Sequence, residues 1–195
     1  MILIGLILLV TIFVNTGLGF LIFLKRSTFR RVNITFSLAS WASAGWILSV
    51  LMAYFFKDPF WRIFWGRMSF ATSGIIPAAF LCFSLLFPRE QRGLSSSKLF
   101  LVGLPSFVIL GLAFTNQIVS SPRFDSQMFN YGPIYPFFSI YLISYIVLGF
   151  IFLIRTYQKA IGLVRLQIKY CLFGMFFTSS LAFITNLFFP MAGIS

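Results

Sequence analysis

Long runs of apolar residues, separated by short basic segments, dominate this sequence. The runs cover approximately residues 2–24, 32–56, 60–87, 99–115, 134–154 and 168–189. At about 1.5 Å of rise per residue, most of them are long enough to cross a hydrocarbon core roughly 30 Å thick as an α-helix. The pattern predicts an all-α polytopic membrane protein in which residues 1–195 form one transmembrane domain, a bundle of six transmembrane helices.

The basic residues are distributed unevenly between the two sides of this predicted bundle. Eleven of the fifteen follow the first, third and fifth runs: Lys25, Arg26, Arg30, Arg31, Arg89, Arg92, Lys98, Arg155, Lys159, Arg165 and Lys169. Loops rich in Lys and Arg stay in the cytoplasm. We therefore expect the N-terminus to lie outside and the odd-numbered loops inside. Six spans that start outside also end outside, so a cytoplasmic output would need a seventh span.

Composition supports the membrane class and narrows the partners. The chain is 59% hydrophobic and 9% charged, with a mean hydropathy of +0.98, which leaves too little polar surface for a water-soluble domain of this length. A net charge of +12 would suggest nucleic acid in a soluble protein. Here the charges set orientation in the membrane, so we expect the lipid bilayer as a partner and no nucleic acid.

Residues for acid–base or metal chemistry are scarce. The chain has no histidine, and its three carboxylates, Asp58, Glu90 and Asp125, lie outside the apolar runs. Both cysteines, Cys82 and Cys171, lie within runs and read as buried structural residues. We therefore expect no catalysis, no metal and no cofactor. A proton-coupled transporter is disfavoured as well, because its relay would need an ionisable group inside a span.

The third run carries the most distinctive residues. Gly66, Ser69 and Gly74 belong to a broad face of small residues, which in membranes lets helices approach closely. We predict that this face is a packing surface. The alternative is that small side chains such as Ser73, together with the carbonyl freed by Pro77, line a cavity that opens outward.

The side chain of Arg67, in the same run, has two possible orientations. Near the end of a span it can extend its charged group toward lipid headgroups. It can also point inward, as an anchor for an anionic or polar ligand or as a partner for Asn186. The ligand-site hypothesis places an outward-opening pocket between the second, third and sixth runs. Its residues are Arg67, Ser73, Pro77, Trp46 and Asn186.

The sixth run repeats the spacing of small residues that favours close helix packing. Gly174, Thr178 and Ala182 recur at every fourth position. This stripe predicts a helix-packing surface and a buried helix at the centre of the bundle.

Several segments resemble the N-terminal seven-helix membrane region of bacterial sensor histidine kinases. They are NITFSLASW at 33–41, DPFWRIFWGR at 58–67, FSLLFP at 83–88, YGP at 131–133 and RLQIKYCLFG at 165–174. The resemblance covers nearly the whole chain, with matching order and spacing. It implies a multi-pass protein of the bacterial cytoplasmic (inner) membrane. It also implies an input module that acts on a cytoplasmic kinase or another output domain in the same or a partner chain.

The chain departs from that pattern because it ends before a seventh helix and lacks the phosphoacceptor histidine. It is then either a fragment of a longer protein or a stand-alone relative that acts through another membrane protein. Our hypothesis is a non-catalytic input module that detects a small or lipidic signal. One alternative is an accessory or scaffold subunit of a larger membrane complex. The other is a small-solute permease, for which the sequence shows no supporting symmetry between its halves.

Overall fold

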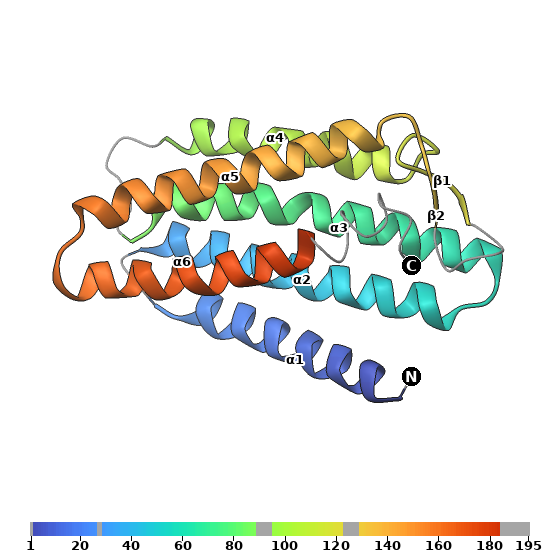
Figure 1. Cartoon of the computed structure of the whole chain (residues 1–195), viewed down its shortest axis with the longest axis horizontal. Coiled ribbons are helices and arrows are strands. Elements are labelled where there is room, and N and C mark those ends of the chain that lie inside the picture. The colour runs from blue at the N-terminus through green and yellow to red at the C-terminus, as the bar shows by residue number, and fades with distance from the viewer. Residues whose placement is uncertain (1, 27–28, 89–94, 123–128, 184–195) are drawn as a thin grey trace.

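The structure is a computed structural model that describes residues 2–26, 29–88, 95–122 and 129–183. Six α-helices and one two-stranded sheet are present in this part of the chain (Figure 1). They are α1 (Ile2–Leu24), α2 (Arg30–Phe55), α3 (Pro59–Leu86), α4 (Ser96–Ala113), β1 (Val119–Pro122), β2 (Phe129–Tyr131), α5 (Tyr135–Lys159) and α6 (Gly162–Phe183). The first five helices are long and apolar enough to cross a membrane, which confirms an all-α polytopic membrane protein.

Several helix ends differ from the ends of the predicted apolar runs. α4 begins at Ser96, three residues before the predicted run, because the Ser95 side chain accepts a hydrogen bond from the Lys98 backbone N–H at 3.3 Å. α5 continues past the predicted end to Lys159. α6 begins at Gly162, and the last predicted residues, 184–189, lie outside the described residues.

α3 has a strong start signal. The Asp58 carboxylate accepts hydrogen bonds from the backbone N–H groups of Phe60 and Trp61, at 3.0 and 3.2 Å. Pro59 occupies the first helical position, where its missing N–H leaves no helical bond unmade. An N-cap of this kind is worth about 1 kcal/mol relative to alanine. The start of the helix is therefore fixed locally.

A short antiparallel β-hairpin occupies the connection between α4 and α5. Val119 pairs with Tyr131, and the register is irregular between Val119 and Ser121. The backbone N–H of Gly132 donates to the Ile118 carbonyl at 2.9 Å. A side chain at Gly132 would bring its Cβ against the Gln117 carbonyl oxygen, so glycine is required there. Strands of three and four residues leave too little periodicity to predict.

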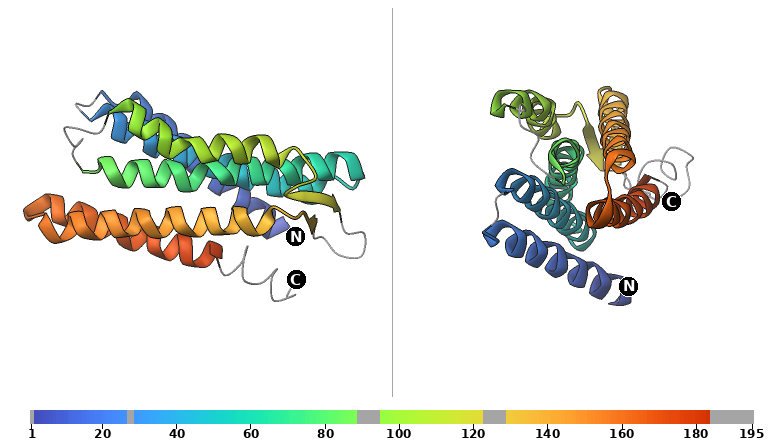
Figure 2. Two further views of the ribbon diagram at one scale, coloured as in Figure 1. Left: turned by 90° about the horizontal axis from the view of Figure 1, so that it is seen from above. Right: turned by 90° about the vertical axis from the view of Figure 1, so that its left-hand side faces the viewer.

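α3 lies at the centre of the bundle. Seen along the bundle in Figure 2, it is surrounded by α2, α4 and α5, whereas α1 rests on α2. In its most apolar stretch 61% of the residues are buried, against at most 22% in the other four candidate spans. The prediction that the helix of the sixth run is central is therefore wrong. α6 packs chiefly on α5 and turns Ile168, Cys171 and Leu172 toward the core.

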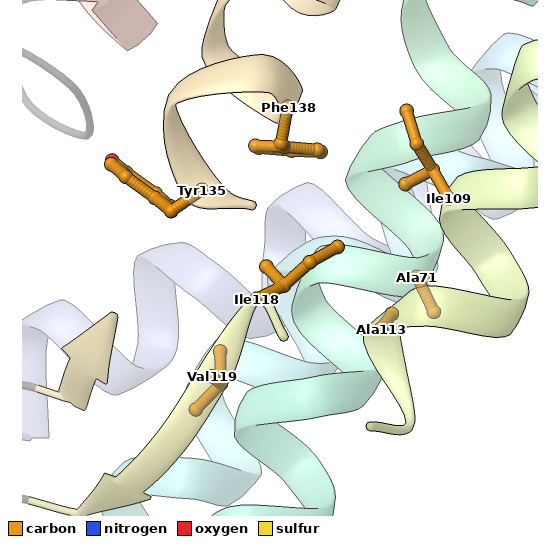
Figure 3. Close-up of a cluster of buried hydrophobic side chains, with 7 residues drawn as sticks. All are labelled: Ala71, Ile109, Ala113, Ile118, Val119, Tyr135 and Phe138. Atoms are coloured by element: carbon orange, nitrogen blue, oxygen red, sulfur yellow. The ribbon is translucent and has the colours of Figure 1, made fainter. Parts of the chain in front are cut away.

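Two clusters of buried side chains lie at opposite ends of α3. The first is at the end that bears the β-hairpin, the hairpin end, and contains Ala71, Ile109, Ala113, Ile118, Val119, Tyr135 and Phe138 (Figure 3). The second is at the end that bears the α1–α2 and α5–α6 connections, the basic end, and contains Val32, Phe80, Phe83, Leu86 and Leu153. α3 contributes side chains to both clusters.

Candidate functional site

Arg67 joins three elements at the hairpin end. Its Nη1 donates a hydrogen bond to the carbonyl of Phe114, the residue that ends α4, at 3.0 Å. Its Nη2 donates to Oδ1 of Asn116 and, at 3.5 Å, to the carbonyl of Val119 in β1. Its Nε is buried and has no hydrogen-bond partner among the described residues. One side chain of α3 thus binds the end of α4 and the start of the hairpin. We call this set of hydrogen bonds the Arg67 clamp.

The electrostatics of this contact favour a cation. All three acceptors of Arg67 are neutral oxygens, and the Phe114 carbonyl belongs to the negative end of the α4 dipole. A cation at such a helix end is stabilised by about 0.3–1 kcal/mol. Of the orientations left open by the sequence, the structure shows a half-buried guanidinium bound to protein. Asn186, the other partner considered for it, lies outside the described residues.

Aromatic side chains cover the hairpin next to this clamp. The rings of Tyr131 and Tyr135 stack with centroids 4.1 Å apart, and Phe70 of α3 packs edge-on against both. Figure 3 shows Tyr135 and Phe138 of α5 above Ile118 and Val119. Burial, reinforced by the neighbouring Tyr135, raises the pKa of Tyr131 to about 12. The hairpin is therefore held against α3 by apolar packing as well as by Arg67.

The other predicted pocket residues are dispersed. Ser73 donates to the Phe70 carbonyl of its own helix at 3.1 Å, and Pro77 is fully buried. Trp46 is half-buried on α2. Within the described ranges, no hydrogen bond or ring contact joins any two of Arg67, Ser73, Pro77 and Trp46. Their joint role in a ligand site stays a prediction.

The small residues of α3 are covered by neighbouring helices. Gly66, Ser69 and Gly74 are all buried, and the Ser69 hydroxyl donates to the Gly66 carbonyl at 2.7 Å. A Cβ added at Gly74 would lie 2.6 Å from Cγ2 of Ile109 in α4. The absence of a side chain at Gly74 therefore permits the close approach of these two helices.

The small residues of α6 have different surroundings. A Cβ added at Gly174 would meet nothing within 4 Å, and Thr178 is exposed. Ala182 lies in the last described turn of α6. The packing role of this stripe stays a prediction that would require a partner other than the described residues.

Two tyrosines that the sequence analysis did not single out make contacts between helices. Tyr141 of α5 donates to the Gly74 carbonyl at 2.9 Å, and Tyr145 donates to the Val102 carbonyl of α4 at 3.2 Å. They are one turn apart on a helix otherwise rich in aliphatic residues. That spacing of hydroxyl groups within an apolar run is the signal that could have identified them.

Comparison with known proteins places the chain in a family. The family described as the N-terminal 7TM region of histidine kinase matches residues 7–195. No curated protein and no solved structure matches the chain. A 7TM region of this kind is the membrane input module of a signal-transduction protein and not its catalytic part. Since the match covers nearly the whole sequence, the chain belongs to the family of N-terminal seven-transmembrane regions of histidine kinases.

Proposed function

We propose that this input module detects a small or lipidic signal at its hairpin end and transmits it along α3 to the basic end. The observation that carries the proposal is the position of α3. It bears the Arg67 clamp near one end, is the most buried of the candidate spans, and contributes to the clusters at both ends. A displacement of α3 at the hairpin end therefore has a packed route to the other end.

The clamp supplies a mechanism for detection. A polar or anionic group that takes over the hydrogen bonds of Arg67 would release α4 and the hairpin from α3. The unpartnered Nε offers a further donor to such a group. Ser73, Trp46 and Asn186 would complete an outward-opening pocket between α2, α3 and α6. Bound signal would tilt α3 about Pro77 and shift the basic end.

The distribution of basic residues supports one orientation in the membrane. The basic end carries Lys25, Arg26, Arg30, Arg31, Lys98, Arg155, Lys159, Arg165 and Lys169 among the described residues. We propose that this end faces the cytoplasm and a kinase or another output domain. The hairpin end then faces the extracytoplasmic side of the bacterial inner membrane.

The test joins this chain to a histidine kinase output domain through one added transmembrane helix, which returns the chain to the side of the basic end, and measures autophosphorylation in phospholipid vesicles. We expect Arg67→Ala to change the basal kinase level several-fold, because breaking the clamp mimics detection. Asn186→Ala should alter it in the same assay. Lys57→Ala, which removes an exposed basic residue near the same end, should leave it unchanged. If neither Arg67→Ala nor Asn186→Ala changes the kinase level, the pocket assignment is wrong.

A second candidate is an accessory subunit of a larger membrane complex. The observation that favours it is the open face of α6, where Gly174 is flanked by Phe173, Phe176 and Phe177, each more than 60% exposed. Such a face accepts a helix from another protein. Co-purification of a membrane complex that is lost on Gly174→Leu would support this role. Purification of the chain without a partner, before and after that change, would contradict it.

A further inference from the structure

Two of the packed helices contain an internal proline. Pro77 lies within α3 and Pro105 lies within α4. Proline has no backbone N–H, so the carbonyls four residues earlier, those of Ser73 and Leu101, lose their helical donor. The proline ring also clashes with the carbonyl four residues earlier, which favours a kink. In the hydrocarbon core no water replaces the missing bonds, so contacts from neighbouring helices have a large influence on these turns.

Tyrosines of α5 donate to a backbone carbonyl in the turn before each proline. The Tyr141 hydroxyl donates to the Gly74 carbonyl at 2.9 Å, and the Tyr145 hydroxyl donates to the Val102 carbonyl at 3.2 Å. Gly74 lies three residues before Pro77, and Val102 lies three residues before Pro105. The same relation thus occurs twice, from tyrosines one turn apart whose rings lie 4.6 Å from each other.

Ser106 connects the two contacts. Its hydroxyl lies 2.8 Å from the Tyr141 hydroxyl. A tyrosine hydroxyl has a single hydrogen. Since Tyr141 donates that hydrogen to Gly74, Ser106 must be the donor to Tyr141. Ser106 follows Pro105 directly, so the hydroxyl of Tyr141 is bonded to the proline-containing turns of both α3 and α4.

We propose that Tyr141 and Tyr145 form a hydroxyl latch, which holds the proline-containing turns of α3 and α4 in a single conformation. With the latch made, the half of α3 that bears Arg67 is fixed relative to the half that ends at the basic end. With the latch open, α3 pivots about Pro77 and α4 about Pro105. The inference does not rest on the proposed signal, because the latch is defined by contacts within the bundle.

Hydrogen exchange measured by mass spectrometry on the purified chain in lipid nanodiscs tests the latch. Tyr141→Phe keeps the ring and removes the hydroxyl. We expect it to accelerate exchange about fivefold in peptides covering 74–82, the amount that one lost hydrogen bond implies. Tyr145→Phe should do the same in peptides covering 102–110. Tyr170→Phe on α6, an exposed ring 70% accessible, is the matched control and should exchange as the wild type does.

Three outcomes would overturn the latch. One is wild-type exchange near Pro77 in Tyr141→Phe. Another is an equal acceleration in all six helices, which would indicate general destabilisation. The third concerns Pro77→Ala, which restores a continuous helix and should abolish the effect of Tyr141→Phe, so a full effect in the double variant would contradict the role of the proline. If Pro77→Ala does not fold, Ser106→Ala is measured instead. It keeps the Tyr141–Gly74 bond and should leave the 74–82 peptides unchanged, so an acceleration there as large as that of Tyr141→Phe would contradict the latch.

Discussion

Helices α3 and α6 each carry a stripe of small residues, and the bundle covers the first stripe while leaving the second open. Gly74 of α3 faces Ile109 so closely that a side chain at this position would overlap with it. Gly174 of α6 has open space where a Cβ would stand. The two stripes have the same kind of pattern in sequence, and the difference between them lies in their neighbours.

The cause of the difference is the number of helices that pack around α3 and around α6. α6 turns Ile168 and Leu172 toward the core, whereas Gly174 lies on the open face together with large side chains such as Phe173. α3 packs against α2, α4 and α5, and these neighbours bury its small residues Gly66, Ser69 and Gly74. A small-residue stripe therefore shows where a close approach is allowed, and other contacts decide whether one occurs.

The largest expected effect comes from adding the same side chain to each stripe. Gly74→Leu should destabilise the bundle by about 1–3 kcal/mol, because α4 must move away from the inserted side chain. Gly174→Leu should change stability by less than about 0.5 kcal/mol, as is usual for open surface positions. Thermal unfolding in detergent, followed by tryptophan fluorescence, measures both. Equal losses for the two variants would show that α6 is packed as tightly as α3.

A smaller effect is expected from exchanging arginine for lysine on the two helices. Arg67→Lys keeps the charge but replaces a planar fork that reaches three acceptors by one compact ammonium group. We expect a loss of about 1–2 kcal/mol, seen as a lower unfolding midpoint and faster exchange in residues 114–119.

Arg165→Lys on α6 is the matched control for that change. Arg165 is exposed, and its guanidinium lies 4.8 Å from the centre of the Tyr157 ring. Replacing it should cost less than about 0.5 kcal/mol, because lysine keeps the charge over the ring. A larger loss for Arg165→Lys than for Arg67→Lys would contradict the importance given to the clamp.

The smallest effect concerns pH. The pKa of Tyr131 is raised from 10.0 to about 12 in the folded chain, so folding favours its neutral form. That contribution to stability is complete below pH 10 and is lost as the pH rises toward about 12. Tyr131→Phe should remove this part of the alkaline destabilisation, measured by unfolding midpoints together with tyrosinate absorbance. Identical alkaline profiles for the variant and the wild type would contradict it.

The sequence predicted the helices well because hydropathy and length determine spanning segments in a membrane. It did not predict the β-hairpin, whose strands of four and three residues are too short to show alternation. It also placed the wrong helix at the centre. Burial in a membrane bundle depends on how many neighbours surround a helix, and the α6 stripe contains no information about that number.

The candidate site was only partly accessible to sequence reasoning. Arg67 and Pro77 stood out because a charge and a proline within an apolar run are unusual. The partners of Arg67 could not be predicted, because two of them are backbone carbonyls, those of Phe114 and Val119, which any sequence supplies. The acceptors of Tyr141 and Tyr145 could not be predicted for the same reason, because they are also backbone carbonyls.

The clamp of Arg67 also bears on how the chain is made. Its acceptors come 47–52 residues later in the sequence. At a synthesis rate of about 5–20 residues per second, the ribosome delivers α3 roughly 2–10 s before the end of α4 exists. During that interval the nascent protein holds an arginine in the membrane with none of its final partners. α3 can therefore reach its final place only after the chain that encloses it has been inserted.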